Sequence, residues 1–131
     1  MKKILAFLFI VCMMLSLFSC QSKQIKLNEE KSYFSDYKIE NDKVYIYYTL
    51  FIENKSDAEK DISLKASFEK DVENGLLKKA LVSGYSLDEI TQEFQLQKGE
   101  NQVDVIFIGE YAGADKKHDR LLPDIEIAEI E

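Results

Sequence analysis

The chain has no tryptophan, one proline, one histidine and five glycines that stand singly. Isolated glycines do not make the glycine-rich loop that binds nucleotide phosphates. The two cysteines, Cys12 and Cys20, both lie within the first twenty residues, so the rest of the chain has no disulfide framework. No HExxH motif, cysteine cluster or calcium-hand loop supplies metal ligands. We therefore expect no cofactor and no metal, and a domain that depends on its hydrophobic core.

Long apolar runs are also absent, with one exception near the N-terminus. Lys2 and Lys3 precede fifteen residues, 4–18, of which all but Ser16 are apolar. A positive segment followed by an apolar one is typical of a secretory signal peptide. The run is shorter than the ~20 residues that a helix needs to cross a bilayer. We therefore expect a removable signal and not a permanent membrane span.

The end of this run resembles the lipobox of bacterial lipoprotein precursors, because Leu17, Phe18 and Ser19 lead directly to Cys20. The resemblance implies that diacylglycerol is attached to the Cys20 sulfur and that the signal peptide, residues 1–19, is then removed. Two or three acyl chains, such as palmitate, give a stable anchor where one chain is marginal. We therefore expect a protein that is lipid-anchored at the extracytoplasmic face of the cell membrane.

Negative charge is in excess. The chain has 17 basic and 24 acidic groups, a formal net charge of −7, and loss of Lys2 and Lys3 would change this to −9. Such a surface repels nucleic acid, so we expect no nucleic-acid partner. Residues 20–31 are polar and predict a short tether, with one early strand near Ile25 and Leu27. Residues 32–131 are enough for a single domain.

From Phe34 onward the apolar period is two, which is typical of β-strands. Residues 44–52 are apolar on both faces and predict a central strand, whereas residues 61–69 alternate and predict a strand with one wet face. Further strands are predicted at residues 94–96, 103–107 and 125–127. Turn-forming residues at 40–43, 54–57 and 98–101 predict hairpin connections.

Helical signals are weak. Residues 86–89 match a capping box and predict one short turn, and Asn74-Gly75 interrupts any helix that begins near Glu69. Strands that recur every ~10 to 15 residues without a βαβ rhythm favour an antiparallel β-sandwich. The predicted fold class is therefore all-β, with about seven strands.

Four segments also resemble small bacterial lipoproteins whose single domain is an immunoglobulin-like sandwich of unknown function. The resemblance implies that architecture and no particular activity. The absence of a Cys, Trp, Cys core excludes the disulfide-bonded immunoglobulin family proper. The matching segments are FIENKS at residues 51–56, GLL at 75–77, VIFIGEY at 105–111 and RLLP at 120–123.

Catalytic groups are few. His118 lies in a strongly charged stretch, and Ser83 and Ser86 lack the context of an activated nucleophile. Three acids, Asp115, Asp119 and Asp124, would suit calcium, but the intervening Lys116, Lys117 and Arg120 oppose it. We therefore expect no enzymatic activity. The alternative, a small envelope enzyme, would require Glu110, His118 and Asp119 to gather around a cavity.

Residues 109–123 form the longest predicted loop, and loops on rigid scaffolds often carry binding residues. Two interpretations remain open here: the loop binds a partner, or Leu121 and Leu122 pack onto the sandwich while Arg120 pairs with a carboxylate. The tyrosines at positions 45, 47 and 48 offer a second interaction surface. The candidate surface on the loop comprises Tyr111, Asp115, His118, Asp119 and Arg120.

The sequence thus predicts a lipid-anchored cell-envelope protein that acts as a binding or accessory module. Its partner, a protein or a small ligand, is not specified by any motif. A protective or inhibitory lipoprotein is the remaining alternative, since fold alone does not fix function.

Overall fold

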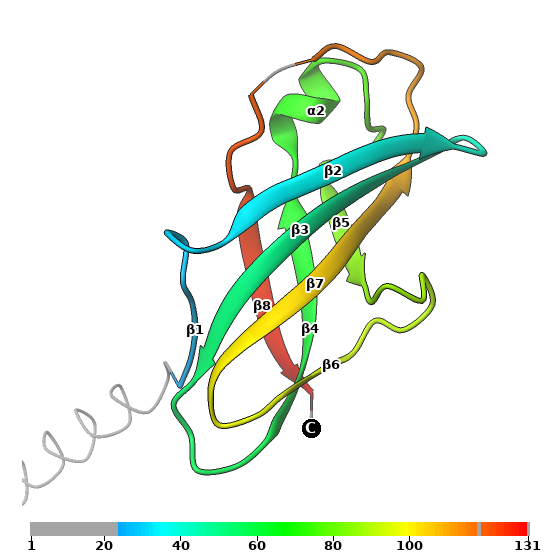
Figure 1. Ribbon diagram of the computed structural model, residues 1–131. Coiled ribbons are helices and arrows are strands. Elements are labelled where there is room, and N and C mark those ends of the chain that lie inside the picture. The colour runs from blue at the N-terminus through cyan, green and yellow to red at the C-terminus, as the bar shows by residue number, and fades with distance from the viewer. Residues whose placement is uncertain (1–23, 118, 131) are drawn as a thin grey trace, which may run out of the picture.

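The computed structural model describes residues 24–117 and 119–130, which form eight strands and one short helix (Figure 1). The expected signal peptide and Cys20 lie outside the described residues. Within these residues no helix is long and apolar enough to cross a membrane. The elements in chain order are β1 (Ile25–Leu27), β2 (Tyr33–Glu40), β3 (Lys43–Asn54), β4 (Lys60–Ser67), α2 (Glu69–Glu73), β5 (Leu81–Tyr85), β6 (Phe94–Leu96), β7 (Gly99–Glu110) and β8 (Asp124–Ile130).

Every strand pairing is antiparallel, and the predicted all-β, sandwich-like class is confirmed. In one layer, β3 pairs with β7 on one side and with β1 and β2 on the other. In the second layer, β4 pairs with β8 on one side and with β5 and β6 on the other. The long strands β2, β3 and β7 cross in front of β4 and β8 (Figure 1), so that the sheet curls into a half-barrel around its core.

The prediction of a central strand is confirmed by β3. Its inner side chains, from Val44 to Ile52, are at most 2% exposed. The opposite face is also covered in part, because Tyr45, Tyr47 and Phe51 are only half-exposed. The neighbouring strand β7 of the same layer and strands β4, β5 and β6 complete the core. Their buried side chains are Val103, Val105 and Phe107 from β7, and Ile62, Leu64, Ala66, Val82, Phe94 and Leu96 from the other three strands.

The two layers are joined by β5, which changes partner along its length. Leu81–Ser83 pair with β4, whereas Gly84 and Tyr85 pair with β7. The change requires glycine, because a Cβ at position 84 would lie 2.7 Å from Cγ2 of Val105. Absence of a side chain therefore allows the close approach of the two layers.

Two of the predicted hairpins are wrong. The turn at 40–43 does join the paired strands β2 and β3, with Asn41 and Asp42 at positive φ. The turn at 54–57, however, carries the chain from β3 in one layer to β4 in the other. Likewise, β6 and β7 are neighbours in sequence, but β6 pairs with β4. Turn residues reverse the chain in either case, so they do not specify which strand becomes the partner.

The helical predictions are confirmed in outline. A single turn forms after β5 and is held by Asp88. The helix α2 ends at Glu73, and Asn74 caps it before Gly75 at φ +78°. The early strand is also present, since Ile25–Leu27 pair with residues 52–54 of β3. Four residues, 21–24, therefore separate Cys20 from the sheet in the sequence.

Candidate functional site

The loop between β7 and β8, residues 111–123, is fixed to the sandwich by backbone hydrogen bonds. The N–H of Tyr111 donates to the carbonyl of Asp42 at 2.9 Å. The N–H groups of Ala112 and Ala114 donate to Leu76 and Gly75 at 2.9 and 3.0 Å. The first half of the predicted interaction loop therefore runs beside the segment that follows α2 and is hydrogen-bonded to it.

Arg120 holds the second half of the loop. Its guanidinium donates to both carboxylate oxygens of Asp71 in α2, each at 2.9 Å. The same guanidinium lies 4.8 Å from the ring centre of Tyr37 and 5.7 Å from that of Phe34, both on β2. The expected pairing of Arg120 with a carboxylate is therefore confirmed.

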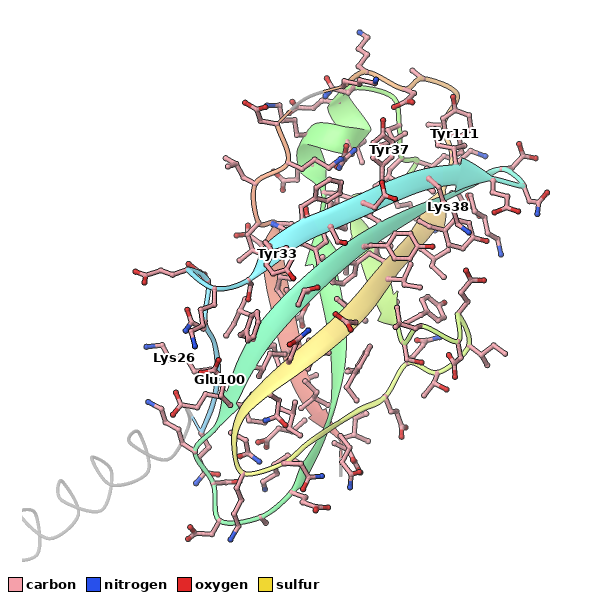
Figure 2. All side chains as sticks on the ribbon, viewed as in Figure 1. Lys26, Tyr33, Tyr37, Lys38, Glu100 and Tyr111 are labelled. Carbon is pink, nitrogen blue, oxygen red and sulfur yellow. The ribbon has the colours of Figure 1, made fainter. Side chains whose placement is uncertain are left out.

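Two further hydrogen bonds, one to Asp115 and one from Tyr48, attach the loop to the sheet. The hydroxyl of Tyr37, which Figure 2 labels on β2, donates to Asp115 at 2.9 Å. This hydrogen bond raises the pKa of Tyr37. The Tyr48 hydroxyl donates to the carbonyl of Leu121 at 3.1 Å, and burial raises the pKa of Tyr48 to about 12. Leu121 itself is 83% exposed, so of the two leucines expected to pack only Leu122 does so.

Of the three residues that the enzyme alternative would gather, the two that are described, Glu110 and Asp119, line separate hollows. Asp119 lies beside Arg120 at a hollow of about 140 Å3 whose lining includes Tyr48 and Phe68. Glu110 lines a different hollow, of about 220 Å3, between β5 and the end of β7. His118 lies outside the described residues. Among the residues that are described, no three His, Cys, Asp or Glu side chains group as metal ligands, and this includes Asp115, Asp119 and Asp124.

A second surface lies on the outer face of β3, β5 and β7. Ile106 of β7 is opposite Tyr47 of β3 and Tyr85 of β5, so their side chains share one face. Although this face is turned away from the core, Ile106 is only 2% exposed. The half-exposed tyrosines therefore cover it and form, together with Tyr45, an aromatic surface that we call the tyrosine face.

Lys38 of β2 borders the tyrosine face, with its ammonium 4.8 Å from the ring centre of Tyr45 (Figure 2). A hydrogen bond to Glu40 raises the pKa of Lys38. Sequence reasoning found Tyr45 and Tyr47 but missed Tyr85 and Ile106. The apolar run at 105–108 contained the signal for Ile106, since a strand that is apolar on both faces has a covered outer side. Tyr48 does not belong to this surface, because it is buried in the core.

Comparisons with protein-family models, with curated proteins and with solved structures found no match to this chain.

Proposed function

We propose that this protein is a lipid-anchored component of the cell envelope that binds a partner and is not an enzyme. The anchor rests on the lipobox-like sequence that ends at Cys20 after an apolar run of signal-peptide length. With this anchor, the start of β1 at Ile25 would keep the sheet within about 20 Å of the membrane surface.

The tyrosine face is the observation that carries the binding role. Tyrosine combines a large apolar ring with a polar hydroxyl and is enriched in protein interfaces. Here three tyrosines from two strands surround a single covered isoleucine, Ile106, on the outer side of the sheet. The surface lies on rigid strands, so a partner would meet it with little loss of side-chain freedom.

The contacts of the loop at residues 111–123 support a role without catalysis. Arg120 and Asp115 are both used in contacts that attach the loop to α2 and β2. Glu110 and Asp119, the acids that the enzyme alternative needs together, line separate hollows. Catalytic pairs must lie within hydrogen-bonding reach of one reacting group.

The anchor is tested by membrane fractionation and mass spectrometry of the full chain and of Cys20→Ala. We expect the unchanged chain to sediment with membranes and to carry acyl chains on Cys20, and the variant to do neither. Cys12→Ala is the matched control, because Cys12 lies in the segment that the signal peptidase would remove. Sedimentation of both variants without acylation would refute the anchor.

The binding role is tested in cells with a photo-reactive amino acid at Tyr47, on the tyrosine face. The control places the same group at Ser63, on β4 in the other layer. We expect a discrete cross-linked product of higher mass from position 47 and none from position 63. Equal cross-linking from the two positions, or none from either, would count against the tyrosine face.

A further inference from the structure

The edge strand β8 exposes unpaired backbone groups. Within the part of the chain that the structure describes, β8 pairs with β4 alone, over seven consecutive residues without a bulge. The N–H of Phe68, just after β4, donates to the carbonyl of Ala80 on the β5 side. Backbone groups alternate in direction along a strand. Since the backbone groups of Phe68 face β5, the N–H and C=O groups of Ser67 face β8, and so do those of every second residue before it in β4.

The register then identifies the free groups of β8. Ser67 is opposite Asp124, and Lys65 is opposite Glu126, so these two residues of β8 direct their backbone groups towards β4. The intervening residues direct their N–H and C=O groups away from the sheet. These residues are Ile125, Ile127 and Glu129.

The inward side chains of β8 lie at the margin of the apolar core. Ile125 and Ile127 are half-buried and pack against the buried cluster. A strand added beside them would pair with their backbone groups and extend the inner apolar row by its own alternate side chains. The other long edge strand, β2, is less suited, because a bulge between Phe34 and Asp36 interrupts its ladder.

Charge decides what kind of strand fits. β8 contains Asp124, Glu126 and Glu129 and no basic residue. Pairing with β8 of a second copy would place these three carboxylates close to three others, and like charges across a ladder are destabilising. An extended segment with lysine or arginine at alternate positions would instead meet opposite charges.

We propose that β8 binds an extended segment of a partner protein, in which basic and apolar residues alternate, by addition of a strand to its free edge. The apolar residues lie beside Ile125 and Ile127, and the basic residues lie beside Asp124 and Glu126. The interaction involves the layer opposite the tyrosine face and is independent of the lipid anchor. It therefore goes beyond the proposed function.

The probe is a synthetic peptide of about eight residues in which lysine and valine alternate, added to the full chain in detergent micelles. We expect hydrogen exchange, followed by NMR, to slow about tenfold at the amides of Ile125, Ile127 and Glu129. A peptide with glutamate in place of lysine should have no effect. A peptide of the same composition, with lysines and valines in two blocks, separates strand pairing from simple charge attraction.

Variants of β8 complete the test. Ile127→Pro removes a free-edge N–H without removing a hydrogen bond to β4, and Ile127→Val keeps that N–H. We expect the proline variant to weaken binding at least about tenfold and the valine variant to keep it. If the proline variant does not fold, the double variant Asp124→Asn, Glu126→Gln, which removes the two charges proposed to meet the basic residues, should show a similar loss. The proposal is overturned by equal binding of the block peptide, by protection outside β8, or by dimerisation through β8.

Discussion

The guanidinium of Arg120 donates two parallel hydrogen bonds to the carboxylate of Asp71, each 2.9 Å long. Both side chains are almost fully buried, with 7% and 3% of their surfaces exposed. The pair joins the loop before β8 to α2, two segments that are far apart in the sequence. Such bidentate pairs are stronger and more specific in geometry than single hydrogen bonds.

Arg120→Gln should destabilise the domain by about 3 kcal/mol, because it leaves the buried Asp71 carboxylate without its guanidinium. Urea unfolding of the full chain in detergent measures the loss. Lys116→Gln, an exposed change in the same loop, should change stability by less than about 0.5 kcal/mol. Equal stability of the Arg120 and Lys116 variants would show that the pair does not hold the loop.

Gly84→Ala should destabilise the domain by about 2 kcal/mol, because the new methyl group overlaps the buried side chain of Val105. The effect should appear as a lower denaturant midpoint with an unchanged m-value. Ser83→Ala is the neighbouring control, since it adds no atom at the junction of β5 with β7. A stable Gly84→Ala variant would mean that the layers can separate slightly at no cost.

Asp88 should contribute stability that disappears in acid. The Ser86 hydroxyl, then the Thr91 hydroxyl and backbone N–H groups, donate to this carboxylate and hold its pKa well below the usual range. Because the folded pKa is depressed, the contribution is complete above the unfolded pKa of ~3.9 and declines as the pH falls below it. Asp88→Asn should therefore be less stable than the unchanged chain at pH 7, with a smaller difference at pH 3. Ser86→Ala should act in the same direction, and a difference that does not vary with pH would contradict this role.

Tyr48 should make the domain sensitive to alkali. Burial raises its folded pKa to about 12, so the folded state keeps the proton between pH ~10 and 12 while the unfolded state loses it. Stability should therefore fall with rising pH in this window. Tyr48→Phe should cost about 1 kcal/mol at pH 7, through loss of the hydrogen bond to Leu121, and should flatten the alkaline decline. An unchanged decline in the variant would assign the effect to other groups.

Local patterns in the sequence were enough to predict most of the strands, although no strand was predicted at β5, Leu81–Tyr85. The two apolar faces of residues 44–52 identified β3 as central, and the alternation at residues 61–69 identified β4 with its wet face. Period-two patterning depends on which face is buried, and that information is present in each segment by itself. The turn at 86–89 and the end of α2 before Gly75 were likewise predictable from local hydrogen-bonding residues.

Pairings between distant segments were not predictable in the same way. Nothing local distinguishes a turn that joins β3 to a neighbour in its own layer from one that crosses to β4. The sequence suggested a carboxylate partner for Arg120, but 24 acids were available and only the fold selects Asp71. Tyr48 was grouped with Tyr45 and Tyr47 by proximity, although the alternation along β3 turns it into the core.

The change of partner within β5 makes the two layers a single cooperative folding unit. Because β5 is hydrogen-bonded to β4 through Leu81–Ser83 and to β7 through Gly84 and Tyr85, neither layer can melt without breaking a ladder that the other also uses. Heat or denaturant should therefore produce one sharp transition with no half-folded sandwich. The most slowly exchanging amides should include those at the junction, where a residue without a side chain allows the layers to meet.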